Sequence, residues 1–343
     1  MPLLPEHRAP QHERAPRPLP LFLELLREVS QSDPELAREA LAGLRAYERA
    51  PRREREGPKP EVARVRGSVL RDQGGRGAPA LIIPSLINPP RILDLDEQVS
   101  LTAAIAGMGR RALLLDWGEA HGRRSLSVSA HIEELLLPIL RHIGEPVTLV
   151  GYCLGGTMAI AAASLASVER VVTIAAPWHF ANYPEDSKHA LLDMWRHSEA
   201  SAEQLGALPM EVLQAAFWSL DPLRTVRKFA EFGHLDPMSV EAWRFIELEE
   251  WANEGEPLPY PSAKELIEDL FGRDLAGSGQ WIGSDQLAVP ALHFTAEHDR
   301  IAPPATAPAG ERVAIASGHV GMIVGSLRHK LHQALRQFLE TRA

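Results

Sequence analysis

The segment VTLVGYCLGGTMAIAAA, residues 147–163, constrains the fold more than any other stretch of this 343-residue chain. An apolar run ends at Val150, the pentapeptide GYCLG follows, and a helix rich in small residues begins at once. Because the chain must turn sharply from strand to helix, we expect a strained backbone at Cys153. We also expect glycines where a side chain would collide with the neighbouring strand or helix. This is the nucleophile-elbow pattern Gly-x-Ser-x-Gly, with cysteine in the place of serine.

The elbow lies within an alternation of strand and helix patterns. Short, continuous apolar runs predict parallel strands that are covered on both faces, and helical patterns such as residues 131–143 and 327–342 accompany them. The runs are Ala80–Ile83, Ala112–Leu115, Val147–Val150, Val171–Ala175, Ala291–Thr295 and Val313–Ala316. Repeated units of this kind predict an α/β fold with a mostly parallel, doubly covered sheet.

We expect three regions along the chain. Residues 1–60 would hold a disordered segment, 1–18, and two helices, the second with Asp33 as N-cap and Pro34 at its first position. Residues 61–176 and 284–343 would form the catalytic core. Residues 177–283 contain six of the seven tryptophans and indicate a helical insertion, which we expect to cap the site. The alternative is a packed helical subdomain with no role in ligand binding.

Cys153 is the predicted nucleophile. The start of a helix favours a thiolate, and the amide of Leu154 would face a developing oxyanion. The loop after the strand at 80–83 would supply the second oxyanion donor from the Ser85–Leu86 region, assigned to Leu86. The alternative, that Cys153 is a small buried hydrophobic residue, is the usual fate of a lone cysteine, but its position at the elbow argues against it.

An acid and a base complete the predicted triad. Asp299 follows the strand ALHFTA, and His319 follows the last strand after Gly318. The chain order nucleophile, acid, base predicts an α/β-hydrolase fold with Cys153, Asp299 and His319 as the catalytic residues. We reject His298, since adjacent residues on an extended loop point apart. We also reject Asp116, because it lies on the N-terminal side of the nucleophile, and we expect it to cap the following turn.

Composition narrows the function classes. A net charge of −9 argues against a nucleic-acid partner, and the single cysteine cannot form an internal disulfide. The N-terminus lacks the apolar stretch of a signal peptide, and no window is long enough to span a bilayer, so we expect a cytoplasmic protein without a transmembrane segment. We expect no cofactor and no metal.

With these residues assembled, the sequence resembles the polyhydroxyalkanoate (poly-3-hydroxybutyrate) synthases. The resembling pieces are LIIPSLINPPRILDL, ALLLDWG, GYCLGGTMA, HFTAEHDRIAPP and SGHVGMIV, which span about residues 65 to 335 in family order. The length and the short loop after Asp299 look most like the two-subunit class. SLINPP and the AAPWHF segment match the family only approximately.

The resemblance implies a cysteine acyltransferase. Its substrates would be a 3-hydroxyacyl-CoA and the growing polyester chain, with an acyl-enzyme at Cys153 and release of CoA. His319 would be the general base and Asp299 the acid. A homodimer or a partner synthase subunit is implied as the assembly. A thioesterase or polyester hydrolase of the same fold stays open, as does a non-catalytic subunit that binds granules or a partner.

Overall fold

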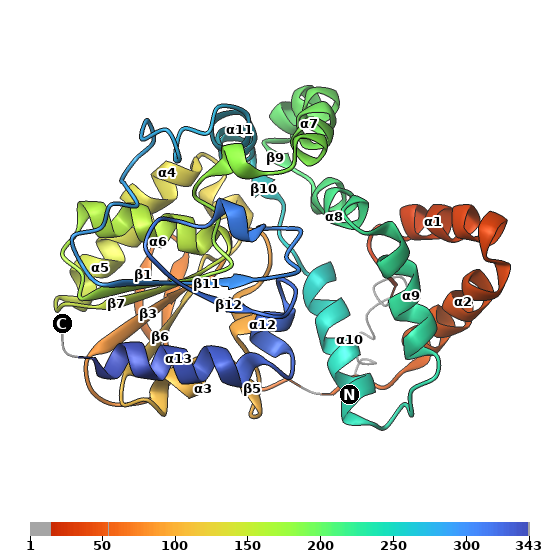
Figure 1. The fold of residues 1–343 in the computed structure, drawn as a ribbon, viewed down its shortest axis with the longest axis horizontal. Helices are drawn as coiled ribbons and strands as arrows, with labels where there is room; N and C mark the ends of the chain where they lie inside the picture. Colours follow the sequence, from red (N-terminus) through yellow and green to blue (C-terminus); the bar gives the residue numbers. More distant parts are fainter. Residues whose placement is uncertain (1–14, 54, 342–343) are drawn as a thin grey trace, which may run out of the picture. The chain divides into compact units, whose positions relative to one another are not determined.

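The computed structural model describes residues 15–53 and 55–341. Two compact units make up the chain (Figure 1). One contains the residues up to Glu56 together with Glu211–Glu254, and the other contains Gly57–Met210 and Gly255–Ala343. We call them the helical unit and the sheet unit and describe each by itself.

The sheet unit is built on eight strands in the order β1-β2-β6-β3-β7-β8-β11-β12. Strand β2 runs antiparallel to both of its neighbours, and the pairs from β6 to β12 are parallel. The strands are β1 (Glu61–Val65), β2 (Ser68–Asp72), β3 (Pro79–Ile83), β6 (Arg111–Asp116), β7 (Thr148–Tyr152), β8 (Arg170–Ile174), β11 (Ala291–Ala296) and β12 (Glu311–Ile315). All six expected strands are therefore present.

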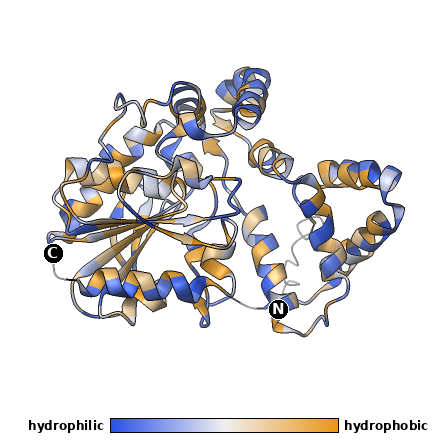
Figure 2. Cartoon of the chain, in the orientation of Figure 1, coloured by the Kyte–Doolittle hydropathy of each residue, from blue (hydrophilic) through white to orange (hydrophobic). Residues whose placement is uncertain are grey.

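Helices cover both faces of this sheet (Figure 1). One face carries α3 (Leu101–Ala106) and α13 (Arg328–Glu340). The other carries the run α4 (Val128–His131), η4 (Ile132–Leu136) and α5 (Leu137–Ile143), and the helix α6 (Leu154–Leu165). Every residue of β3, β7 and β8 is buried, which explains their continuous apolar sequences. Figure 2 shows the same hydrophobic character along the sheet.

This architecture is an α/β-hydrolase fold. The mostly parallel sheet has a strand-to-helix turn at Cys153, between β7 and α6, and the chain order of the predicted triad follows the fold. Shorter elements connect the core: η2 (Pro90–Leu93), β4 (Asp94–Asp96), β5 (Val99–Ser100), η3 (Ala120–Arg123), η5 (Phe180–Asn182), η7 (Pro304–Thr306) and α12 (Gly321–Val324). The fold predicted from the sequence is confirmed.

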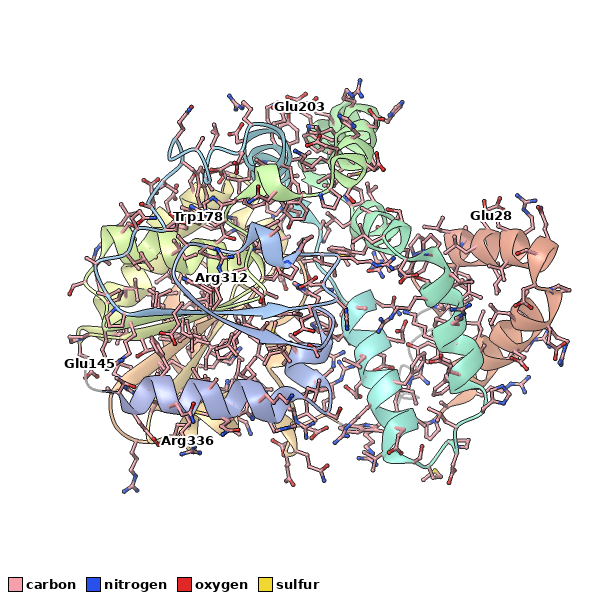
Figure 3. All side chains as sticks on the ribbon, in the orientation of Figure 1. Glu28, Glu145, Trp178, Glu203, Arg312 and Arg336 are labelled. Carbon is pink, nitrogen blue, oxygen red and sulfur yellow. The ribbon has the colours of Figure 1, made fainter. Side chains whose placement is uncertain are left out.

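Part of the expected insertion belongs to the sheet unit. Its elements are α7 (Glu185–Leu205), β9 (Ala207–Leu208), β10 (Leu258–Pro259), α11 (Tyr260–Lys264) and η6 (Glu265–Gly272). Trp195 stacks on Tyr260 and donates its Nε1–H to Glu268 at 2.9 Å. Trp178 is 1% exposed and contacts Trp281 edge-on. Figure 3 shows Trp178 on the α5–α6 side of the sheet and Arg336 on the α13 side.

The helical unit is a bundle of α1 (Leu19–Ser32), α2 (Pro34–Arg49), α8 (Met210–Ser219), α9 (Pro222–Phe232) and α10 (Val240–Asn253). Asp33 caps α2 as expected, since its side chain accepts the N–H of Leu36 at 3.0 Å. The core of the helical unit is aromatic. Four rings make edge contacts around α9, namely those of Phe22, Tyr47, Phe229 and Phe245. An isolated pair of amphipathic helices could not bury such faces, so α1 and α2 pack on a segment far along the chain.

This division crosses the expected region boundaries. Residues 211–254 lie with the N-terminal helices, whereas 177–210 and 255–283 lie with the sheet. Residues 1–14 of the expected disordered segment lie outside the described residues. Ala15 is buried, and the Nε–H of Arg17 donates to Glu211 at 2.7 Å within the helical unit. Across the described residues, no helix is both long and apolar enough to cross a bilayer.

Candidate active site

Cys153 lies at the junction of β7 and α6 in a strained conformation. Its φ of 55° and ψ of −130° fall in a region that non-glycine residues rarely occupy. Such strain costs about 1–3 kcal/mol and persists only where surrounding structure holds it. The N–H of Cys153 donates to the carbonyl of Ile174 in β8 at 2.9 Å, which ties the turn to the next strand. The expected backbone strain is confirmed.

The glycines around Cys153 allow close approach. A Cβ at Gly151 would lie 2.4 Å from the Cα of Gly156, and one at Gly155 would lie 2.2 Å from the carbonyl oxygen of Ile83. A Cβ at Gly156 would meet the Cβ of Ala176 at 2.4 Å. Only hydrogen fits at these positions, which confirms the prediction for Gly151 and Gly155 and adds Gly156. The contact at Gly155 also places the end of β3 directly against the start of α6.

The structure brings Asp299 and His319 together beside Cys153. The Nδ1 atom of His319 lies 2.7 Å from Oδ2 of Asp299, and both side chains are buried. The other carboxylate oxygen of Asp299 accepts the amides of Ile301 and Ala302 at 2.8 and 2.9 Å. A carboxylate held in this way keeps the imidazole in one orientation, with its second nitrogen free for Cys153.

Charge favours a protonated imidazole at His319. Burial opposes protonation, but the negative charges of Cys153 and Asp299, and hydrogen bonds with both, outweigh it and raise the pKa of His319 to about 10. An imidazolium beside a thiol stabilises the thiolate, which is the nucleophilic form of cysteine. The arrangement can therefore support covalent catalysis by Cys153.

Two tyrosines that the sequence analysis missed border the triad. The ring of Tyr152 lies 5.2 Å from the ring of His319, and its buried hydroxyl has no hydrogen-bond partner among the described residues. The hydroxyl of Tyr183 donates to the carbonyl of Ile301 at 2.8 Å, on the loop that carries Asp299. Burial and then the charges of Cys153 and Asp299 raise the pKa of both tyrosines well above its ordinary value. In the sequence, only the position of Tyr152 beside Cys153 could have indicated that a tyrosine borders the triad.

The two predicted oxyanion donors flank the elbow. Leu154 is the first residue of α6, and Leu86 lies in the loop after β3 that packs against Gly155. Within the described part of the chain, neither backbone amide donates to a protein acceptor. Such unsatisfied donors at the start of a helix and in an adjoining loop are what an oxyanion hole requires.

Neither of the two rejected residues contacts the triad through a side-chain bond found in the described residues. His298 is exposed, while Asp299 beside it is buried. Asp116 accepts the N–H of Gly118 at 3.0 Å through its carboxylate, which confirms its expected task at the turn after β6.

The proteins found to be similar in sequence all carry the same name. The chain is 28% identical over 284 residues to the poly(3-hydroxyalkanoate) polymerase subunit PhaC of Haloferax mediterranei, covering 73% of this chain and 56% of the relative. It is 26% identical over 298 residues to the protein of the same name from Haloarcula marismortui, covering 78% and 61%. The chain is similar in sequence to PhaC polymerase subunits.

A third PhaC subunit, from Synechocystis sp., is 26% identical over 295 residues, which is 77% of this chain and 78% of that relative. This chain spans 56% and 61% of the lengths of the two haloarchaeal relatives. No family model matches the chain.

Solved structures similar to this chain share little of its sequence and include a hydrolase, an esterase and bromoperoxidases. E-2-(acetamidomethylene)succinate hydrolase has a TM-score of 0.47 at 15% identity, covering 80% of this chain and 95% of its own. An esterase from Exiguobacterium antarcticum has a TM-score of 0.48 at 13% identity, covering 81% and 98%.

Proposed function

We propose that this chain is a cysteine acyltransferase that polymerises 3-hydroxyacyl-CoA into polyhydroxyalkanoate. The observation that carries the proposal is the coincidence of two features. Cys153 stands at a strained elbow beside the His319–Asp299 pair, and the relatives at 23–28% identity are all named poly(3-hydroxyalkanoate) polymerase subunits. A triad alone would support several acyl-transfer reactions, and the names of the relatives favour polymerisation among them.

The first half-reaction would form an acyl-enzyme. His319 takes the thiol proton of Cys153, and the thiolate sulfur bonds to the thioester carbonyl carbon of the substrate. The carbonyl oxygen becomes an oxyanion that accepts hydrogen bonds from the amides of Leu154 and Leu86. When the carbon–sulfur bond to CoA breaks, the imidazolium returns its proton to the leaving thiolate, so CoA departs as a thiol.

The second half-reaction would extend the ester. His319 accepts the proton of a hydroxyl on the second acyl unit, and that oxygen attacks the acyl carbon on Cys153. The new carbon–oxygen bond replaces the bond to Cys153, whose sulfur regains its proton from His319. A cysteine suits this cycle because the thiolates that leave and attack have similar basicity, so exchange between two thioesters is nearly isoenergetic.

The expected cap, residues 177–283, remains a proposal for the parts of it that belong to the sheet unit, residues 177–210 and 255–283. Its beginning borders the triad, because Tyr183 bonds to the loop that carries Asp299. Apolar side chains at such a position would exclude water and favour a hydroxyl acceptor over hydrolysis.

We also propose a cytoplasmic location, since the thiol must stay reduced, and assembly as a homodimer or with a partner synthase subunit. The relatives are named polymerase subunits.

Incubation with 3-hydroxybutyryl-CoA tests this function. Free CoA and insoluble polymer are followed together in the same reaction. Release of CoA in step with polymer is the expected result. Release of CoA with free 3-hydroxybutyrate and no polymer would instead identify a thioesterase. No release of CoA, with or without an added partner synthase, would favour a non-catalytic subunit.

A further inference from the structure

The loop after β3 is held in place by two buried side chains from the segment after β6. The indole Nε1–H of Trp117 donates to the carbonyl of Pro84 at 3.0 Å. The guanidinium of Arg123 donates through Nη2 to the carbonyl of Leu86 at 3.4 Å. Trp117 and Arg123 are each 4% exposed, so water does not compete readily for these bonds.

These two bonds restrict the peptide that lies between them. A peptide unit is planar, so a fixed carbonyl also fixes the amide of the following residue. The bonds to Pro84 and Leu86 immobilise the peptide units on both sides of the Ser85–Leu86 unit, whose N–H is the proposed oxyanion donor. The N–H of Glu256 donates to the carbonyl of Ile87 at 3.0 Å and holds the next unit.

Burial of the charged guanidinium of Arg123 costs free energy, and its hydrogen bonds offset that cost. Its Nε–H donates to the carbonyl of Gly118 at 3.3 Å, and Nη1 lies 3.3 Å from Nε2 of His131. Burial lowers the pKa of Arg123 to about 10, so it remains a charged donor at neutral pH. Nearly all buried arginines are paired, and this one contacts the ring of His131 and two backbone carbonyls.

His131 completes the support for Arg123. Burial lowers the pKa of His131 to about 4, so the ring is neutral. Its Nδ1 lies 2.6 Å from the carbonyl of Ser127 and must be the donor there. Nε2 is then an acceptor for Arg123. The guanidinium is thus fixed from both ends, which a flexible surface arginine would not be.

We propose that Trp117 and Arg123 are positioning residues that hold the Leu86 amide toward the oxyanion formed at Cys153. The proposal rests on the proposed function in one respect, namely that Cys153 reacts through a tetrahedral intermediate. Neither residue would touch the substrate, and both would act through the loop at residues 84–86. Only those reactions of Cys153 that form an oxyanion should therefore depend on Trp117 and Arg123.

Two reactions at Cys153 separate this role from general support of the fold. Acylation by 3-hydroxybutyryl-CoA or by p-nitrophenyl acetate passes through an oxyanion. Alkylation by iodoacetamide does not, because the thiolate displaces iodide from a methylene carbon. Both rates are measured at Cys153 in the full-length chain, at saturating acyl donor, for wild type, Trp117→Phe and Arg123→Met. Trp117→Phe keeps most of the ring and removes the donor, so it decides the outcome if Arg123→Met does not fold.

Arg170→Met is the matched control. Arg170 is 3% exposed and donates to the carbonyl of Phe338 at 3.2 Å, at the opposite end of β8 from Ile174. We expect acylation to slow about tenfold or more in both test variants, as found when an oxyanion donor is displaced, with alkylation changed less than twofold. The control should acylate at the wild-type rate.

Unchanged acylation in Trp117→Phe would overturn the proposal, and so would equal losses in acylation and alkylation. A wild type that is acylated by p-nitrophenyl acetate but forms no polymer would contradict the proposed function alone, because the ester still reports on the oxyanion loop. A wild type that neither donor acylates would overturn both.

Discussion

At the scale of single residues, the site depends on one strained backbone and one buried carboxylate–imidazole pair. Cys153 adopts a φ of 55° only because the glycines at 151, 155 and 156 let strand and helix approach. His319 and Asp299 then lie 2.7 Å apart with their side chains buried. The strained backbone and the buried pair each lower the stability of the fold. Their occurrence at one place therefore indicates a role in catalysis.

Replacing the sulfur of Cys153 by oxygen should leave a weak enzyme. A serine hydroxyl ionises far less readily than a thiol and needs stronger help from the base. We expect Cys153→Ser to release CoA from 3-hydroxybutyryl-CoA at least about 100 times more slowly than wild type, with the same melting temperature. Turnover at the wild-type rate would contradict a role for the thiolate.

Asp299 and His319 should act as a unit. Asp299 orients the imidazole, so its effect disappears once the imidazole is absent. We expect Asp299→Ala to be the milder single change, and the double variant to be little slower than His319→Ala. The rates of CoA release are measured for wild type, the two single variants and the double variant, which together form a double-mutant cycle. Multiplicative losses would show that Asp299 acts independently.

Two buried histidines outside the triad should make the fold acid-sensitive. Burial lowers the pKa of His131 and of His293 to about 4 from an ordinary value of 6.5. The unfolded chain therefore binds more protons than the folded one between these values, so stability falls as pH falls from about 6.5 to 4. The loss is about 3 kcal/mol for each group.

Urea unfolding at pH 7, 5.5 and 4.5 measures this effect. We expect His293→Gln to flatten the decline in the free energy of unfolding, and His142→Gln, at an exposed position, to leave it unchanged. Equal slopes in wild type and His293→Gln would rule out the assignment to His293.

At the scale of elements, much of the sheet follows from sequence and the helical unit does not. The six expected strands were predictable because interior strands buried on both faces read as continuous apolar runs. The β1–β2 hairpin was not individually expected, because β1 is a partly exposed edge strand with charged residues in its sequence. The packing of α2 on α9 joins segments about 180 residues apart and leaves no local signal.

The same distinction holds for the site. Cys153, Asp299 and His319 carry motifs or follow strand ends, so their positions could be predicted. Trp117 and Arg123 could not be, because their contacts with Pro84 and Leu86 span 33 and 37 residues and depend on how two strand-end loops meet. A buried arginine is visible only once its neighbours are known.

The contact between α2 and α9 should be intolerant of a single methyl group. A Cβ at Gly43 would lie 1.7 Å from the carbonyl oxygen of Phe229, so the helices would have to separate. We expect Gly43→Ala to lower the free energy of unfolding by about 3 kcal/mol or more. Gly57→Ala, where nothing lies within 4 Å, should change it by less than about 0.5 kcal/mol. Urea unfolding measures both, and a Gly43→Ala protein as stable as wild type would contradict this packing.

At the scale of the whole molecule, the proposed chemistry belongs to one of the two units. The triad, both oxyanion donors and the residues that hold the oxyanion loop all lie within residues 57–210 and 255–343. The helical unit contributes none of them, although residues 211–254 interrupt the sheet unit in the sequence. We therefore place the covalent intermediate of the proposed reaction on the sheet unit.

Intact-mass measurement after rapid mixing with 3-hydroxybutyryl-CoA tests that claim most directly. We expect a mass increase of one or more hydroxybutyryl units on wild type, mapped by peptide analysis to Cys153. We expect no increase on Cys153→Ala, with an unchanged melting temperature. An acyl adduct that persists in Cys153→Ala, or continued release of CoA by that variant, would contradict a covalent intermediate on Cys153.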